Sequence, residues 1–195
     1  MCVGKNLINL ILISVPFGYA RHARIISPPT GNASHHELEL GVVIGTRCQR
    51  VPAAQAMAHV SGYCLALDMT DRVAQDLAKS EGKPWTAAKG WHTSLPVSDF
   101  VPVSRVPDHT ALHTWLKLNG EATPRQHGCP GRMVFDLPTL IAAVSAVHTL
   151  EPGDLLLTGT PEGVGPAVPG DVITAGITEL DIEICVPVIA PPSLE

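Results

Sequence analysis

The chain has 195 residues, 45% of them apolar, which is enough for one domain with its own hydrophobic core. Its 18 prolines and 17 glycines are typical of a globular protein rich in strands and turns, and exclude a coiled coil or a disordered chain. Because the formal net charge is -5 and the sequence has no basic run, we do not expect nucleic acid as a partner. The five cysteines form no CxxC pair, which predicts reduced thiols in an intracellular compartment.

Residues 1–20 have an unusual composition for the start of a globular domain. They contain one lysine, an apolar run at Leu7–Val15, and Gly18 and Ala20 at the spacing of a signal-peptidase site. The run is too short to span a bilayer, which needs about 20 apolar residues, so we expect no membrane span. Two interpretations stay open: a secretory signal peptide, or a buried first strand with an abnormal continuation.

Hydrophobic periodicity predicts the next elements. Residues 37–45, ELELGVVIG, alternate between polar and apolar and then become continuously apolar, which predicts a strand that starts half exposed and ends in the core. A short helix is expected after Pro52. An apolar strand at 60–69 then places Asp68 at its C-terminal end.

A helix is expected directly after this strand. Thr70 or Asp71 can cap it, and Gly82 stands where a C-cap glycine belongs. The apolar stripe of this helix is formed by Val73, Leu77 and Ala78. Residues 85–107 contain several prolines and are expected to form loop and short strand rather than helix.

The second half of the chain is predicted to be mostly strands. Residues 111–119 form a strand that ends at the turn pair Asn119-Gly120, the following ATPRQHGCPGR is a loop, and residues 137–150 form the longest helix. Three further strands are expected in DLLLTG, DVITAGI and DIEICVPV. Helices are few and separated by runs of strands, so we predict the α+β class with a large β component.

Two glutamates and one aspartate are candidates for a metal site. Alternation places Glu37 and Glu39 on one face of a strand, and Asp68 can supply a third oxygen from a neighbouring strand. Three carboxylates without a paired Lys or Arg repel one another by roughly several kcal/mol unless a divalent cation neutralises them. Oxygen ligands favour Mg²⁺ or Mn²⁺ over zinc. The alternative is that the glutamates face solvent on an edge strand and that Asp68 only caps a helix.

Two adjacent histidines precede the glutamates. Since alternation sends His35 and His36 to opposite faces of the strand, at most one of them can reach the carboxylates. We therefore interpret both as structural or supporting residues rather than as metal ligands.

Four motifs occur in the order HHELELGVVIG, LDMTDRVAQ, GKPWTAAKGWHTSLPVS and LLLTGTPEGVGPAVPGD. Together they resemble the fumarylacetoacetate hydrolase family, in particular its acylpyruvase and oxaloacetate decarboxylase branch, from about Ser34 to Val188. The resemblance implies a mixed β-sandwich or roll of the fumarylacetoacetase C-terminal-domain type with a few short helices. It also implies a homodimer, and Mg²⁺ or Mn²⁺ held by Glu37, Glu39 and Asp68. We expect an atypical segment at 1–33 and a catalytic domain at 34–190.

The same resemblance implies residues that contact substrate. Lys89 matches a substrate-contacting, catalytic lysine of the family, and Gln75 matches a glutamine that binds substrate by a hydrogen bond. Without the family context, Lys89 would be interpreted as a solvated lysine and Gln75 as a polar surface residue. In LTGTPEGVGP, the Thr160 hydroxyl and nearby backbone N–H groups can hold a ligand carboxylate, and a plain glycine-rich turn is the alternative.

The N-terminal part departs from the family pattern. Residues 2–6 read C-V-G-K-N, which matches the family's first strand except that Lys5 replaces an arginine and loses its bidentate fork. The segment that follows, 7–26, has no His-x-x-Glu pair, the family's dyad for activating the hydrolytic water. A second departure lies in a loop that normally helps to close the site, where Cys129-Pro130-Gly131 replace small polar residues.

These features predict a divalent-metal-dependent enzyme acting on small 2-keto acids. The expected reactions are acylpyruvate hydrolysis at a carbon-carbon bond, and decarboxylation or tautomerisation of oxaloacetate through an enolate stabilised by the metal. The alternative is an impaired homologue that binds metal and ligand without turnover, since the dyad is missing. The matching C-V-G-K-N motif favours an intracellular chain, mitochondrial or cytoplasmic, over a secreted one.

Overall fold

The computed structural model describes residues 24–192, so the predictions for Lys5, for the apolar run and for a targeting segment lie outside the described part of the chain. The described strands form three sheets. The five-stranded sheet has the order β1 (Ile25–Ile26), β12 (Ile182–Ile189), β11 (Val172–Ile177), β7 (Thr114–Leu118) and β8 (Gln126–Gly128). The four-stranded sheet has the order β6 (Val101–Pro102), β4 (Val60–Leu67), β3 (Leu38–Ile44) and β9 (Leu155–Leu157). The three-stranded sheet has the order β10 (Gly165–Ala167), β2 (Ser34–His36) and β5 (Thr70–Asp71).

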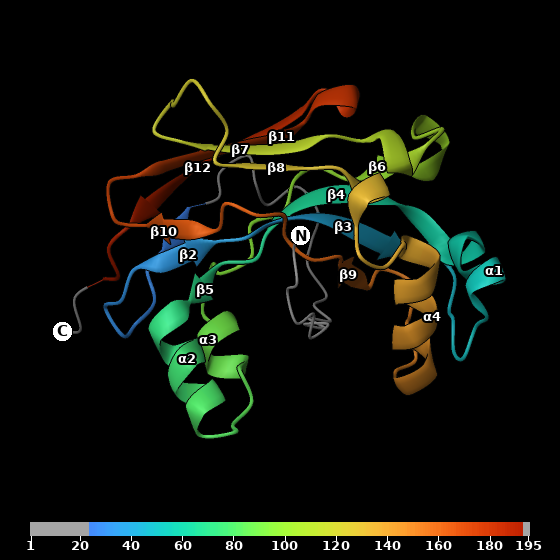
Figure 1. Cartoon of the computed structure of the whole chain (residues 1–195), viewed down its shortest axis with the longest axis horizontal. Coiled ribbons are helices and arrows are strands. Elements are labelled where there is room, and N and C mark those ends of the chain that lie inside the picture. The colour runs from blue at the N-terminus through green and yellow to red at the C-terminus, as the bar shows by residue number, and fades with distance from the viewer. Residues whose placement is uncertain (1–23, 193–195) are drawn as a thin grey trace.

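The sheets are stacked, and the main core lies between them. In Figure 1 the five-stranded sheet lies above the other two. Leu40 and Val42 of β3 belong to the same buried cluster as Leu116 of β7 and Ile173 of β11. Among the strand pairs within residues 24–192, β1 and β12 are parallel and the others are antiparallel. The predicted β-rich α+β fold, a mixed sandwich with a few short helices, is confirmed.

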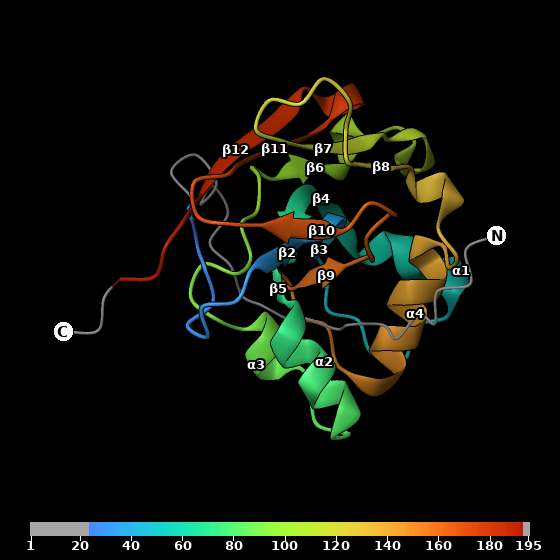
Figure 2. The same cartoon turned by 60° about the vertical axis from the view of Figure 1, so that its left-hand side comes forward.

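The described part of the chain has four α-helices at the margins of the sheets, namely α1 (Ala53–Ala56), α2 (Arg72–Ser80), α3 (Thr86–Lys89) and α4 (Leu137–Val147). Helices α2 and α3 lie together beside β5, and α1 lies with α4 at another side (Figure 2). The Asp71 side chain caps α2 by accepting a hydrogen bond from the Ala74 amide at 3.0 Å, as predicted. The 3-10 turns are Met57–His59, Val103–Arg105, His109–Ala111, Pro130–Arg132 and Thr178–Leu180. No helix within residues 24–192 is both long and apolar enough to cross a bilayer.

Some local predictions were wrong because pairing and packing partners are remote in sequence. Strand β3 is buried along its whole length rather than half exposed at its start. Its second face packs on a separate apolar cluster that includes Cys64 and Leu155. The expected loop at 122–132 contains β8, which pairs with β7 after the turn at Asn119-Gly120, and β10 was not foreseen. Part of the expected loop at 85–107 forms α3, a single helical turn packed on α2. In the apolar stripe of α2, Val73 and Leu77 are exposed and Ala78 is half-buried, and Gln75 is the one buried residue of this helix.

Candidate active site

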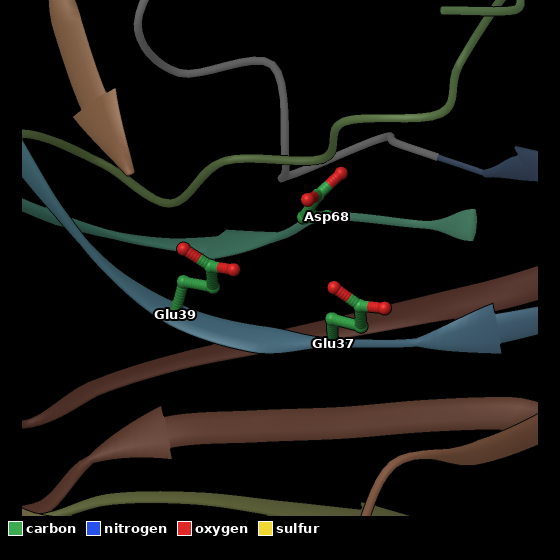
Figure 3. A group of neighbouring side chains, drawn as sticks. All are labelled: Glu37, Glu39 and Asp68. Carbon is green, nitrogen blue, oxygen red and sulfur yellow. The ribbon is translucent and has the colours of Figure 1, made fainter. Parts of the chain in front are cut away.

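Three acidic side chains converge where β3 and β4 lie side by side. Glu39 belongs to β3, Glu37 precedes it directly, and Asp68 follows β4. The antiparallel register pairs Leu38 with Leu67, and the Asp68 amide donates to the Glu37 carbonyl at 2.9 Å. One carboxylate oxygen from each acidic residue lies within 4.8 Å of the others. Figure 3 shows the side chains of Glu37 and Glu39 on one side of the same stretch of chain, facing Asp68. The structure therefore brings the predicted trio together.

The two faces of β3 explain why the glutamates share a side. Leu38, Leu40 and Val42 enter the main core between the sheets, whereas Val43 joins the second apolar cluster on the opposite face. Because side chains alternate along a strand, the glutamates at odd positions point to the face of Val43. All three acidic residues are buried, with exposed fractions of 8% for Glu37, 5% for Glu39 and 1% for Asp68. The alternative of glutamates facing solvent on an edge strand is wrong.

Two cations accompany the carboxylates, contrary to the expectation that no Lys or Arg pairs with them. The Lys89 ammonium donates to Glu37 Oε2 at 2.9 Å and to Asp68 Oδ2 at 2.6 Å. The Arg72 guanidinium forms an ion pair with the other oxygen of Glu37, which also accepts from the Thr70 hydroxyl at 3.0 Å. Glu39 has no cation partner among the described residues, and Gly159 N donates to its carboxylate at 2.6 Å. The charge imbalance is therefore concentrated at Glu39.

The pKa values follow this distribution of charge. Burial acts to raise the pKa of the Glu37 carboxyl, but Lys89 and Arg72 outweigh it and hold that pKa below its usual range. Burial raises the pKa of Asp68 to about 6, against the opposing effect of Lys89. Burial and then the Asp68 charge raise the pKa of Glu39 to about 8. A carboxyl whose ionisation is this unfavourable gains most from a cation placed beside it.

The donor set fits a hard divalent cation. All its ligand atoms are carboxylate oxygens, which suit Mg²⁺ and Mn²⁺ and not a soft metal. The Lys89 ammonium already bridges Glu37 and Asp68, so two of the three carboxylates are arranged to share one positive charge. The cluster of Glu37, Glu39 and Asp68 can therefore hold a metal ion.

A cavity of about 730 Å³ opens beside this cluster. Glu37 and Glu39 form part of its wall, together with Gln75, Thr160 and Arg132. Its remaining wall is mixed, with apolar side chains such as those of Leu157 and Phe135. A pocket with a few convergent polar groups in an apolar wall is typical of a site for a small molecule.

The glycine-rich loop after β9 closes one side of the cavity. Gly159 and Gly163 both have positive φ angles, 97° and 96°, which favour glycine. A Cβ at Gly163 would lie 1.8 Å from the Arg125 carbonyl oxygen, so no other residue fits there without moving the backbone. This tight approach holds the loop against β8. The Gly159 amide and the Thr160 hydroxyl thereby come close to Glu39 and to the cavity.

The residues expected to contact substrate occupy different places. Gln75 and Thr160 border the cavity, whereas Lys89, which contacts Glu37 and Asp68, is not part of the cavity wall, and neither is Asp68. The Gln75 carbonyl oxygen accepts hydrogen bonds from Arg72 and from Lys79, the latter at 3.2 Å. A direct contact of each of these residues with a substrate stays a prediction.

Arg72 is a residue of the site that the sequence patterns did not reveal. It lies in the first turn of α2, three positions before Gln75, and its guanidinium joins Gln75 to Glu37. The signal that could have revealed it is this spacing, since residues three apart on a helix lie on the same face. Arg72 also borders the cavity.

The chain belongs to the fumarylacetoacetate hydrolase family, because the family model "Fumarylacetoacetate (FAA) hydrolase C-terminal" matches residues 18–186. The resemblance stated from the motifs is thereby confirmed. The fold is shared with solved members, such as a fumarylpyruvate hydrolase from Pseudomonas aeruginosa in complex with Mn²⁺ and pyruvate. That structure has 31% sequence identity and a TM-score of 0.81, over 88% of this chain and 73% of the other.

Two further relatives are similar over most of the chain. Human "oxaloacetate tautomerase FAHD1, mitochondrial" is 53% identical over 191 residues, which cover 91% of this chain and 86% of the relative. The "oxaloacetate decarboxylase, mitochondrial" of Dictyostelium discoideum is 48% identical over 149 residues, covering 76% of this chain and 67% of the relative. Both relatives, like the solved fumarylpyruvate hydrolase, are named as enzymes.

Proposed function

We propose that this chain is a divalent-metal-dependent enzyme that acts on small 2-keto acids. Its main reaction would be tautomerisation or decarboxylation of oxaloacetate, with acylpyruvate hydrolysis as a weaker activity. The observation that carries the proposal is the cluster of three buried carboxylates beside a cavity of about 730 Å³. The names of the relatives, which include an oxaloacetate tautomerase and an oxaloacetate decarboxylase, support the substrate.

Each group of the site has a task in this proposal. Glu37, Glu39 and Asp68 would hold Mg²⁺ or Mn²⁺, and the bound ion would polarise the keto oxygen of the substrate as a Lewis acid. Lys89 and Arg72 keep Glu37 in place through their ion pairs. The Thr160 hydroxyl and Gln75 would bind polar groups of the substrate from the cavity wall. Lys89 adds a positive charge beside the carboxylates, which favours anionic groups nearby.

The missing dyad weighs against hydrolysis more than against the oxaloacetate reactions. Hydrolysis of an acylpyruvate needs a base that activates water, and the segment 7–26 lacks the family's His-x-x-Glu pair. Loss of a general base slows such a step by about 10²- to 10⁴-fold. Decarboxylation depends chiefly on withdrawal of electrons at the keto group, which takes up the electron pair of the broken C–C bond as CO₂ leaves. Tautomerisation also moves a proton between C3 and the keto oxygen, and solvent water can carry this proton once the keto group is polarised. We therefore favour an active enzyme over a homologue that only binds ligand.

The test uses the purified chain with oxaloacetate and with acetylpyruvate, each in the presence of Mg²⁺, Mn²⁺ or EDTA. We expect metal-dependent loss of the oxaloacetate enol signal and release of CO₂, with slower cleavage of acetylpyruvate. Rates are compared with the same metal in buffer, because free metal ions also accelerate both oxaloacetate reactions. If neither substrate shows turnover above that background, the proposal is wrong.

Metal binding is expected to release a proton. Because burial raises the pKa of metal-free Glu39 to about 8, its carboxyl is mostly protonated at pH 7, and a metal can bind only the carboxylate. Raising the pH from 6 to 8 removes this proton beforehand, so the apparent affinity for Mg²⁺ should rise by about tenfold or more over that interval. Calorimetric titration with Mg²⁺ in buffers of different ionisation enthalpy measures the protons released. An affinity independent of pH would contradict the expectation.

Arg132 is expected to favour a dicarboxylate substrate. It borders the cavity in the loop that departs from the family pattern, and it pairs with no carboxylate within residues 24–192. Oxaloacetate has a second carboxylate that acetylpyruvate lacks. Arg132→Ala should lower kcat/KM for oxaloacetate about five- to tenfold, a typical effect of one exposed charged contact. It should change the value for acetylpyruvate less than about twofold, and Arg105→Ala, also exposed, is the control. Equal losses on both substrates would refute this role.

We also propose a homodimer in a mitochondrial or cytoplasmic location. The dimer rests on the resemblance to the family, and the location is supported by the relatives named as mitochondrial. Sedimentation of the purified chain tests the first statement, and fractionation of cells expressing the tagged full chain tests the second.

A further inference from the structure

Gln126 of β8 makes four polar contacts from a fully buried position. Its exposed fraction is 0%. At one end, Gln126 Oε1 accepts a hydrogen bond from the Leu38 amide at 3.1 Å and lies 2.9 Å from His36 Nδ1. At the other end, Gln126 Nε2 donates to the Thr160 hydroxyl oxygen at 2.7 Å and to the Pro161 carbonyl at 3.0 Å. This side chain therefore joins the strand of the acidic cluster to the glycine-rich loop.

Backbone groups at both ends fix the orientation of this amide. The Leu38 N–H can only donate and the Pro161 carbonyl can only accept, so a flipped amide would lose both bonds. His36 must then donate from Nδ1, because Gln126 Oε1 only accepts. His36 Nε2 is buried and has no hydrogen-bond partner among the described residues, which agrees with a ring that carries its proton on Nδ1. The buried pair of His36 and Gln126 therefore has one defined hydrogen-bond direction.

That direction determines what the Thr160 hydroxyl can do. Its oxygen accepts the Gln126 bond, and its hydrogen has no acceptor among the described residues. Thr160 borders the cavity, so this hydrogen is available to a molecule inside it. A hydroxyl that accepts a hydrogen bond from an amide is also a stronger donor, because the bonds of a chain polarise one another.

We propose that Gln126 is a positioning residue that makes the Thr160 hydroxyl a hydrogen-bond donor to an anionic oxygen of the substrate. The proposal rests on the keto acid function proposed above and names the group that recognises the carboxylate or enolate oxygen. Leu38 lies between Glu37 and Glu39, so the bond from its amide also ties this donor to the carboxylate cluster. His36 contacts Gln126 Oε1, at the opposite end of the amide from the glycine-rich loop, and so helps to hold its orientation.

Two substitutions test the Thr160 hydroxyl and the Gln126 amide separately. Thr160→Val keeps the shape of the side chain and removes the hydroxyl. Gln126→Glu keeps the length and, in its ionised form, offers only acceptors at that end, so the Thr160 hydrogen turns toward it and away from the cavity. Gln126→Met is measured beside it, because its side chain has no donor in any protonation state. Each variant should lower kcat/KM for oxaloacetate about 10- to 100-fold, the range for one hydrogen bond to a charged group. Thr160→Ser restores the donor and should recover most of the loss.

The double variant decides whether Gln126 acts through Thr160. If it does, Gln126→Glu should cost less than about threefold further in the Thr160→Val background, because the donor is already gone. Calorimetry measures the affinity of the Mn²⁺-loaded protein for pyruvate. This affinity should fall in each single variant, and the double variant should lose little more than Thr160→Val alone. Mn²⁺ affinity should stay within about twofold of wild type, which a general collapse of the site would not permit.

Two results would overturn the proposal: multiplicative losses in the double variant, or a Thr160→Val variant that binds pyruvate and turns over oxaloacetate like wild type. If Gln126→Glu abolishes cooperative thermal unfolding, Gln126→Met replaces it in both backgrounds and is judged by the same comparison. Wild-type turnover tests the proposed function by itself. If that fails, pyruvate calorimetry on the same variants still decides between a donor and a merely structural threonine.

Discussion

Glu39→Gln is expected to abolish metal-dependent turnover while making the metal-free protein more stable. Glutamine removes one of three carboxylates that can hold the ion, and a neutral amide is a poor replacement for a carboxylate at a hard cation. We expect oxaloacetate turnover to fall by about 10³-fold or more, the scale of a lost Lewis acid. The increase in unfolding temperature on adding Mg²⁺ should disappear as well.

The gain in stability follows from the pKa of Glu39. Folding raises this pKa to about 8, so in metal-free protein the unfolded state binds fewer protons than the folded state between about pH 4.5 and 8. Stability contributed by the neutral carboxyl is therefore lost progressively as the pH rises through that window. Glutamine mimics the neutral form and avoids the loss. The difference in Tm between variant and wild type should grow from pH 5 to 8, by roughly 2–4 °C per kcal/mol.

Thermal unfolding in EDTA at several pH values measures this difference. Glu183→Gln, which changes an exposed carboxylate of β12, is the matched control and should leave both Tm and turnover close to wild type. A Glu39→Gln protein that is less stable than wild type at pH 8 without metal would show that its carboxylate is not under strain from burial and like charge.

The acidic cluster could be predicted from sequence because its geometry is local. Alternation along one strand places Glu37 and Glu39 on one side, and the end of the next apolar strand supplies Asp68. The antiparallel register that pairs Leu38 with Leu67 then brings the two strand ends together. Each step needs only the strand period and the pairing of neighbouring strands.

The counter-charges and supports could not be predicted because they depend on remote packing. Lys89 ends a one-turn helix that the prolines around it argue against, and only its packing on α2 and β5 directs its ammonium to the carboxylates. Gln126 reaches Leu38 and Thr160, which are 88 and 34 positions away. No local pattern carries such information.

Lys89→Met is expected to destabilise the metal-free protein and to increase its response to Mg²⁺. The ammonium is the shared partner of two buried carboxylates, with side chains only 6%, 10% and 2% exposed for Lys89, Glu37 and Asp68. Removing one partner of a buried pair costs about 3–5 kcal/mol, because the other charge is left uncompensated. We therefore expect a clear drop in Tm in EDTA. The Tm increase caused by Mg²⁺ should exceed that of wild type, since the ion then supplies the missing charge.

Turnover by the same variant separates two tasks of Lys89. If its ammonium only compensates the carboxylates, saturating Mg²⁺ should restore oxaloacetate turnover to within a few-fold of wild type. If it also acts on the substrate, kcat should remain about 10²- to 10³-fold lower at any Mg²⁺ concentration, because a preorganised charge near the developing enolate is absent. Lys83→Met, which removes an exposed lysine paired with Glu81, controls for loss of a positive charge in general. Unchanged Tm in EDTA together with an unchanged Mg²⁺ response would contradict the counter-charge role. Lys89 pairs with two carboxylates and does not line the cavity, so the counter-charge role is the first to be tested.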